Sequence, residues 1–482
     1  MTNQTAKTWR SRLFHGIGAL CCLLLLAVIF LAWDKRSTGK FIVTDAPLVV
    51  LTHVRVVDGT GAPAREDQVI VIESGRIKSI DDSSKASVPT GGKQIDLTGH
   101  TAIPGLVGMH EHLFYTTDAG ARDVAANVSF ARLYLASGVT TIRTGGTLSL
   151  ENDQLTKKQV ENGEWLGPKI HLTSPYINHR VGESLNPQQL AEQIDGWASE
   201  GVTSFKIYTN ISRAELSAGV RAAHKRGLKV TGHLCAVGFR EAADLGIDNL
   251  EHGLVVDTEF YSAKRTDQCP QRSDWLPELA KLDVMSPHVQ EMIRELVSHG
   301  VAITSTLPIF ETYAGQRFQI DPRMQYALTP QAYASCLSHI QREREDTRWP
   351  KLWEAVLKKE MQFEHEFVKA GGLLMAGTDP TGWGGVIAGF GDQRGLELLV
   401  EAGFTPEEAI RIATLNGALF LGEASRIGTL TVGKQADIII VRGNPSSSIS
   451  DIRNVELVFK DGAGYDSAKL IESVHGLVGG ES

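Results

Sequence analysis

The chain has 482 residues, of which 42% are apolar and 22% are charged, and its formal net charge is −8. This is the composition of a globular protein long enough for one large domain and a smaller one. No cluster of Lys and Arg interleaved with aromatic residues stands out, so a nucleic-acid partner is not expected.

The first segment, residues 1–40, differs from the rest of the chain. Lys7, Arg10 and Arg12 precede an unbroken apolar run over 16–33. The run has about the minimum length for a membrane span, and its basic flank favours a cytoplasmic start. We therefore expect a transmembrane helix that anchors the body of the protein on the periplasmic side of a membrane. A cleaved signal peptide is the alternative, and the body would then be periplasmic or secreted.

Residues 41–100 are predicted to form β-strands, including a hairpin whose strands flank a turn over 73–75. Residues 423–463 carry a matching pattern of apolar strands closed by polar turns. Strand-rich segments at opposite ends of a chain can pair, so we predict a small β-sandwich domain built from both ends. The residues that follow, 464–482, are predicted to be a loose tail.

The middle of the chain, residues 101–422, repeats one unit in which a helix ends at a glycine and an apolar strand follows. Eight strands separated by helices are predicted, over 101–107, 139–142, 168–173, 202–207, 228–230, 246–247, 300–303 and 371–375. This alternation predicts an α/β fold, a (β/α)8 TIM-type barrel. Two stretches exceed the pattern, 253–299 and 309–350, and we expect them to cap the barrel mouth.

Three cysteines lie in the body that is expected to be exported: Cys235, Cys269 and Cys336. An oxidising compartment permits a disulfide. Because Cys269 and Cys336 lie in the stretches that least resemble a barrel, we predict that these two pair.

Metal-binding and ionisable side chains follow five of the predicted barrel strands. His110 and His112 are two apart after the first strand, so both imidazoles can point to one face and bind one metal ion. Glu111, between them, points the other way and is expected to be structural. The ends of the fourth, fifth, sixth and eighth strands carry Lys206, His233, His252 and Asp379. Active sites of such barrels lie at this rim, so we predict that all six converge there.

The sequence around these residues resembles that of the amidohydrolase superfamily. The motifs are Pro104-Gly105-Leu106-Val107-Gly108-Met109-His110-Glu111-His112, Glu251-His252-Gly253, Gly377-Thr378-Asp379 and the stretches 405–409 and 428–437. The likeness runs from about residue 47 to residue 463. Within the superfamily, the chain looks like the branch of imidazolonepropionase-like and prolidase-like dipeptidases.

The resemblance implies a metal-dependent hydrolase with two divalent metal ions. Zn²⁺ is the default, since imidazole and oxygen ligands suit it, with manganese, iron and nickel left open. His110, His112 and Asp379 would bind the first metal, whereas His233 and His252 would bind the second. A carboxylated lysine at position 206, formed from Lys206 and carbon dioxide, would bridge the two.

The hypothesis that follows is cleavage of a carbon–nitrogen bond, in an amide or dipeptide substrate, by a metal-activated hydroxide. Asp379 would act as general acid/base and pass a proton to the leaving amine. Two alternatives stay open. One is a mononuclear deaminase or cyclic-amide hydrolase with an unmodified Lys206, and the other is a catalytically inactive binding module.

Substrate-binding residues are predicted from loops at the same rim. His179 and Arg180 follow the third strand and could pair with a substrate carboxylate, although a salt bridge within the loop is an equal alternative. Tyr208 follows the fourth strand. Three further residues lie in segments at the barrel mouth, Arg143, Arg394 and Trp383. The sequence leaves a homo-oligomer open.

Overall fold

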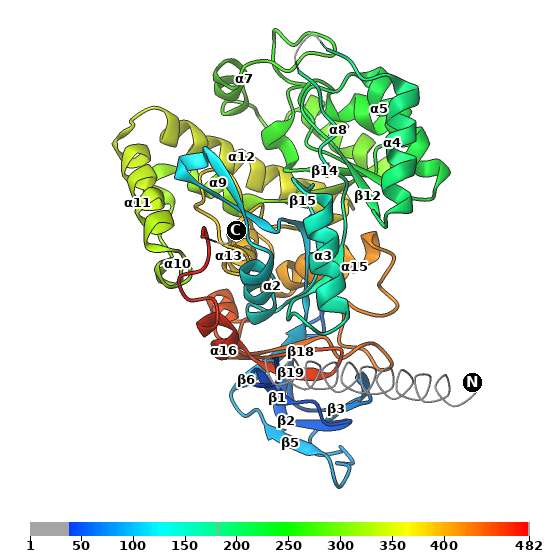
Figure 1. The fold of residues 1–482 in the computed structure, drawn as a ribbon, viewed down its shortest axis with the longest axis vertical. Helices are drawn as coiled ribbons and strands as arrows, with labels where there is room; N and C mark the ends of the chain where they lie inside the picture. Colours follow the sequence, from blue (N-terminus) through cyan, green and yellow to red (C-terminus); the bar gives the residue numbers. More distant parts are fainter. Residues whose placement is uncertain (1–37, 181–182, 481–482) are drawn as a thin grey trace, which may run out of the picture.

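The computed structural model describes residues 38–180 and 183–480. The predicted transmembrane helix, or signal peptide, lies outside these residues. Within the two described ranges, no helix is both long enough and apolar enough to cross a membrane. The described chain forms two parts, a barrel with its surrounding helices and a smaller β-sheet beneath it (Figure 1).

The barrel contains the eight parallel strands that the sequence predicted. They are β7 (Leu106–Glu111), β10 (Val139–Thr144), β11 (Lys169–His171), β12 (Ser204–Ile207), β13 (Lys229–Gly232), β14 (Asn249–Glu251), β15 (Ala302–Ser305) and β16 (Leu374–Ala376). Neighbours in the chain pair with each other, and a parallel bridge between Thr173 and Ser204 joins β11 to β12. The circle is completed beyond β16, where the Thr378 N–H donates to the His110 carbonyl at 3.2 Å. The TIM-type barrel is therefore confirmed.

Helices separate the barrel strands, and their first turns follow the capping signals in the sequence. Helix α4 (Pro187–Ser199) begins after Asn186, whose side chain accepts hydrogen bonds from the next turn. Helix α5 (Arg213–Lys225) begins with a capping box between Ser212 and Glu215. The remaining helices of the barrel side are α2 (Asn127–Ala136), α3 (Leu150–Glu161), α6 (Phe239–Asp244), α8 (Pro287–Ser298), α13 (Phe390–Glu401), α14 (Pro406–Arg411) and α15 (Gly417–Phe420). Helix α2 packs against β10, α3 against β11, and α5 against β12 and β13.

The two long insertions are ordered. After β14 the chain forms a short 3₁₀ turn, η2 (Gly253–Val256), and then α7 (Arg272–Leu279). After β15 it forms α9 (Leu307–Thr312), α10 (Pro322–Ala327), α11 (Pro330–Glu345) and α12 (Trp349–Lys369). Figure 1 shows that α7, α11 and α12 lie around the end of the barrel away from the small sheet. The predicted insertions therefore form a cap of helices.

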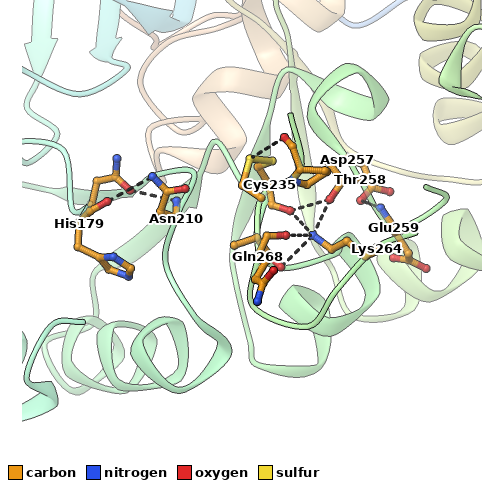
Figure 2. The surroundings of a disulfide bond; sticks show 12 residues. His179, Asn210, Cys235, Asp257, Thr258, Glu259, Lys264 and Gln268 are labelled. Atoms are coloured by element: carbon orange, nitrogen blue, oxygen red, sulfur yellow. Dashed lines mark hydrogen bonds between the residues drawn. A yellow bond between two sulfur atoms is a disulfide. The ribbon is translucent and has the colours of Figure 1, made fainter. Parts of the chain in front are cut away.

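The predicted disulfide is wrong. Cys269 pairs with Cys235, with a Cα–Cα distance of 5.0 Å, and Cys336 is a free, buried cysteine in α11. The physical reason is the path of the first insertion. It returns from β14 to the loop that follows β13, whereas Cys336 packs into a separate apolar cluster with residues such as Phe318 and Ile340. Figure 2 shows the bond and its surroundings.

Both ends of the described chain build the small sheet, as predicted. Its strands are β1 (Ile42–Thr44), β2 (Leu48–Val56), β3 (Arg65–Glu73), β4 (Arg76–Asp82), β5 (Lys93–Asp96), β6 (His100–Pro104), β17 (Ile438–Arg442), β18 (Val455–Lys460) and β19 (Ala463–Asp466). The order β1-β19-β18-β17-β6-β2-β3-β4, with β5 beside β2, makes one continuous sheet where two facing sheets of a sandwich were expected. Strand β6 causes this, because it pairs with β17 on one side and β2 on the other.

Two further expectations need correction. The predicted first barrel strand, 101–107, is two strands, because the chain passes from the small sheet into the barrel at Gly105. A Cβ there would lie 2.1 Å from Thr140 Oγ1, so this crossing requires glycine. The predicted tail is also packed. Helix α16 (Ser467–Glu472) lies against α2, and Leu470 and Val478 are fully buried.

Candidate active site

The six residues predicted to converge do so in one cavity. A cavity of about 460 Å³ opens at the carboxyl ends of the barrel strands. Its lining includes His110, His112, Lys206, His233, His252 and Asp379. Five different strand ends thus contribute to a single site, at the rim where the architecture of the barrel places active sites.

Asp379 lies at the centre of this group. Its Oδ1 is 3.2 Å from His112 Nε2 and 3.7 Å from His110 Nε2, and its Oδ2 is 3.7 Å from His252 Nδ1. One ligand atom from each of His110, His252 and Asp379 lies within 4.8 Å of the other two. His233 stands beside His252, with ring centroids 4.5 Å apart. Buried imidazole and carboxylate groups this close together fit a divalent metal ion such as Zn²⁺.

His110, in β7, and His112, just after β7, are oriented through their Nδ1 atoms. His110 Nδ1 lies 2.7 Å from Glu251 Oε2, and His112 Nδ1 lies 3.2 Å from the Gly146 carbonyl. An imidazole whose Nδ1–H donates to such an acceptor keeps its Nε2 lone pair free. Both Nε2 atoms face Asp379, so they are available as metal ligands.

Burial keeps His110, His233 and His252 neutral. It lowers the pKa of His110 to about 4, and the positive charge of Lys206 contributes to the shift. It also lowers the pKa of His233 to about 3, again with a contribution from Lys206. Burial raises the pKa of Asp379, but attraction to His110, His112 and His252 outweighs it and holds that pKa well below its usual range. Neutral imidazoles and an ionised carboxylate are the forms that bind metals.

Lys206 is the least satisfied group of the site. Its Nζ is buried and makes no hydrogen bond to any residue in the described part of the chain, and the nearest carboxylate oxygen is Glu251 Oε1 at 3.9 Å. Burial lowers the pKa of Lys206 to about 8. A buried amine that is partly neutral near physiological pH, with no hydrogen-bond partner among the described residues, is a group that chemistry or a ligand can complete.

Glu251 is a central residue whose role was not predicted. Besides His110, it accepts hydrogen bonds from Arg143 Nη2 at 2.6 Å and from the Thr231 hydroxyl. Burial raises its pKa, but Arg143, Lys206 and His110 outweigh this and hold it well below the usual range. Arg143, considered for the barrel mouth, instead lies buried inside the barrel, where it also binds the Met109 carbonyl. A charged residue in a barrel strand that is otherwise uncharged was the available signal.

The backbone at two of these residues is unusual. His252 has φ +71° and Asp379 has φ +51°, a left-handed conformation that non-glycine residues rarely adopt. The turn after His252 is held by α12, because Glu360 Oε2 accepts the Val255 N–H at 2.8 Å. A Cβ on Gly253 would lie 1.8 Å from Glu360 Oε1, so the turn fits tightly against this carboxyl group. Such outliers persist where surrounding structure holds them, commonly at functional sites.

Of the predicted substrate-binding residues, Tyr208 lines the cavity and His179 and Arg180 do not. The His179 ring lies 3.2 Å from Glu215 Oε2, and the Arg180 side chain is exposed to solvent. His179 thus pairs with a carboxylate of helix α5, outside its own loop. The cavity wall instead includes residues that were not predicted, among them Phe114, Tyr176, Asn178, Arg272, Phe310 and Tyr313.

The other two residues considered at the barrel mouth have structural contacts. Trp383 is buried and stacks on His339, with centroids 4.5 Å apart. Arg394 pairs with Glu311 and Glu397. Neither lines the cavity of the site.

Comparison with known proteins assigns the class. Residues 101–463 match the amidohydrolase family, and the chain belongs to it. It is a hydrolase that acts on carbon–nitrogen bonds.

Individual relatives are more distant. The imidazolonepropionase of Parabacteroides distasonis is 43% identical over 65 residues, which cover 13% of this chain and 15% of that protein. The imidazolonepropionase of Herpetosiphon aurantiacus is 21% identical over 432 residues, covering 81% of this chain and 90% of that one.

Two solved structures show the same fold. A putative prolidase from Bifidobacterium longum has a TM-score of 0.61 and 24% identity, covering 89% of this chain and 98% of that one. A Xaa-Pro dipeptidase with bound methionine in its active site has a TM-score of 0.65 and 21% identity, covering 87% and 100%.

Proposed function

We propose that the protein hydrolyses an amide or peptide-like bond of a small molecule with two divalent metal ions, Zn²⁺ by default. His110, His112 and Asp379 would hold one metal, and His233 and His252 the other. The observation that carries the proposal is the convergence of these side chains, with Lys206, in one cavity. Their chemistry supports it, because the set is rich in imidazole and carboxylate donors and burial keeps His110 and His233 neutral.

Lys206 is proposed to be carboxylated. Its neutral amine adds carbon dioxide, so that an Nζ–C bond forms and one proton leaves, and the product carries one negative charge shared by two oxygens. The lowered pKa and the absence of a hydrogen-bond partner among the described residues support this. The modified side chain would then bridge the two metal ions.

When bound, the metals acidify water and polarise the substrate carbonyl group. Asp379 then performs the proton transfers. As a carboxylate it accepts a proton from the attacking water, and as the acid it returns that proton to the leaving amine nitrogen. The Thr381 hydroxyl donates to Asp379 Oδ1 at 2.7 Å and holds the carboxylate toward the cavity.

The cavity wall orients the substrate and limits its contact with water. Tyr208 and Tyr176 lie together on one side, with ring centroids 5.1 Å apart. Phe310 and Tyr313 come from α9 and its end, in the second insertion. Aromatic surfaces of this kind suit an apolar or aromatic substituent beside the scissile bond.

The test is turnover of a panel of dipeptides, N-acyl amino acids and cyclic amides by the zinc-loaded protein. Hydrolysis should stop on chelation and return with Zn²⁺. Asp379→Asn should lower kcat by about 10²- to 10⁴-fold, which is the usual contribution of a general acid/base. Near wild-type turnover in an Asp379→Asn protein that still holds its metals would overturn the assigned role.

Cyclic-amide hydrolysis with one metal and an unmodified Lys206 is the second candidate. The likeness to proteins named imidazolonepropionase favours it. Metal content separates the two candidates, because the first requires two ions per chain and the second requires one.

We also propose that the catalytic body lies outside the cytoplasm. The Cys235–Cys269 disulfide supports this, since such bonds persist in oxidising compartments. Fractionation of the native cells with an antibody against the body tests it, and a cytoplasmic signal would contradict it.

A further inference from the structure

One segment of the cap, residues 257–272, is fixed to the loop that follows strand β13. The Cys235–Cys269 disulfide joins the two covalently. Lys264 adds to the connection, because its Nζ donates to the carbonyls of Cys235 and Ala236 and to the Thr258 hydroxyl (Figure 2). Cys235 follows His233 by two residues, so the segment is tied next to a candidate metal ligand.

Arg272 lies at the end of this segment, three residues after Cys269, and begins α7. Its side chain lines the active-site cavity. Within residues 38–180 and 183–480, its guanidinium takes part in no hydrogen bond and no ion pair. The guanidinium makes a cation–π contact with Trp353, in which Cζ lies 5.7 Å from the ring centroid. By contrast, Arg394 and Arg323 are each paired with carboxylates. Arg272 therefore presents unused donors to the cavity.

Aromatic rings connect the candidate metal ligands to Arg272. The His252 ring is 5.8 Å from Phe310, and Phe310 stacks on Trp353 at 5.9 Å with an angle of 14° between the planes. The Arg272 guanidinium lies over the Trp353 ring. A substrate whose amide reaches the histidines thus has an apolar wall beside it and a cation at the end of that wall.

The charges of the lining set the direction in which an anion can bind. The carboxylate of Asp379 lies among the histidines and repels an anion there. Among the described residues that line the cavity are one lysine, Lys206, and one arginine, Arg272. Lys206 is buried. Asp123, from β9 (Arg122–Ala125), is also part of the lining and repels an anion. A guanidinium presents paired donors that match the two oxygens of a carboxylate.

We propose that Arg272 binds the free carboxylate of the amino acid that leaves, and that the Cys235–Cys269 disulfide positions Arg272 for this contact. The inference rests on the proposed function and deepens it. The substrates are dipeptides or N-acyl amino acids with a free C-terminal carboxylate, and their C-terminal amides are poor substrates. Arg272 is thus a specificity-determining residue.

The kinetic test compares the best-hydrolysed member of the substrate panel with its own C-terminal amide. In the wild type, kcat/KM should favour the free acid by about 10- to 100-fold, the usual worth of a charge-assisted hydrogen bond. Arg272→Gln should bring the ratio close to one and leave the metal content unchanged. Arg265→Gln is the matched control, because Arg265 is an exposed arginine of the same segment and does not line the cavity. Equal rates for acid and amide in the wild type would overturn the proposal.

A binding test does not require turnover. L-phenylalanine and L-phenylalaninamide serve as probes of the leaving amino acid, and calorimetry measures their affinity for the zinc-loaded protein. The acid should bind at least about tenfold more tightly to the wild type and to Arg265→Gln, and this preference should vanish in Arg272→Gln. No preference in the wild type, or no binding of either probe, overturns the role of Arg272. Selective binding without hydrolysis of any panel member would instead contradict the proposed function alone.

The positioning role of the disulfide is tested with the double variant Cys235→Ala/Cys269→Ala. Its preference for the acid over the amide should fall severalfold, while its metal content and its circular dichroism spectrum stay those of the wild type. Cys336→Ala is the control, since Cys336 is the free cysteine and lies in α11. An unchanged preference in the folded double variant shows that the disulfide does not position Arg272.

Discussion

Glu251 offers the sharpest test of how the barrel interior supports the site. Its two carboxylate oxygens are fully buried and serve different partners. Oε2 lies 2.7 Å from His110 Nδ1, and Oε1 accepts from Arg143 Nη2 at 2.6 Å. One carboxylate thus orients a proposed metal ligand and also neutralises a buried guanidinium. The perturbation is Glu251→Gln, which keeps the shape of the side chain and removes its charge.

The magnitude follows from these contacts. An amide has one acceptor and one donor end, so it cannot accept hydrogen bonds from both His110 and Arg143 at the two positions. The buried Arg143 also loses its counter-ion. Removing one partner of a buried ion pair costs about 3–5 kcal/mol of stability. Losing the carboxylate behind a ligating histidine lowers metal affinity by about 10- to 100-fold.

The assay measures both quantities on the same protein. Denaturant unfolding of the metal-free protein gives the change in stability, and competition with a chelator gives the metal affinity. Glu111→Gln is the matched control, since Glu111 is equally buried but has no salt bridge within the described residues. Burial also raises its pKa well above the usual range, so a neutral amide resembles its native form. If Glu251→Gln stays within about 1 kcal/mol of the wild type and binds metal equally well, the reasoning is refuted.

Three other predictions concern the surroundings of the site. Glu360→Ala removes the acceptor of the buried Val255 N–H, so the free energy of unfolding should fall by about 1–3 kcal/mol. The same variant loosens the turn after His252, so the metal that His252 helps to hold should bind at least about tenfold more weakly. Removing the Cys235–Cys269 disulfide, which spans 34 residues, should lower the free energy of unfolding by about 4 kcal/mol. Because burial lowers the pKa of Lys206 to about 8, its neutral amine becomes abundant above that pH. At a fixed concentration of dissolved carbon dioxide, metal loading should be roughly tenfold faster at about pH 9 than at about pH 7.

Each of these three predictions has a control or a result that would contradict it. Glu354→Ala, at an exposed position of the same helix α12, should change stability by less than about 0.5 kcal/mol. A peptide map without reductant that links Cys336 to another cysteine would contradict the disulfide assignment. Loading that is equally fast at both pH values would show that the amine of Lys206 does not limit metal uptake.

The barrel and the convergence of the six residues were predictable for a shared reason. Glycine-ended helices alternate with short apolar strands, and this pattern is local in the sequence. Once the strands are counted, the topology of the barrel brings their carboxyl ends together. His110 and Asp379 therefore meet although 269 residues separate them in the chain.

The features that were missed depend on contacts between distant segments. The disulfide pairing follows from the path of an insertion that has no repeating pattern, and three cysteines allow three pairings. Arg143 looks like a rim residue, but its role is decided by Glu251 on a strand that lies elsewhere in the chain. The helix α16 looks like a tail until α2 is present to bury Leu470.

Loop residues were the least predictable part of the site. Arg180 was considered as a carboxylate partner because it follows a barrel strand, with a salt bridge in the loop as an equal alternative, yet it is exposed and Arg272 lines the cavity. Arg272 lies 20 residues after His252, the candidate metal ligand that precedes it in the chain. Spacing in the sequence therefore does not indicate that Arg272 lines the cavity. Its position depends on the segment that the disulfide holds.

Metal content per chain, measured by elemental analysis in the wild type and in Lys206→Ala, tests most directly whether the site holds two metals and depends on Lys206. We predict two metal ions per wild-type chain and one or none in the variant, with an unchanged circular dichroism spectrum. One metal ion in both proteins would contradict the bridged site and would favour single-metal, cyclic-amide chemistry.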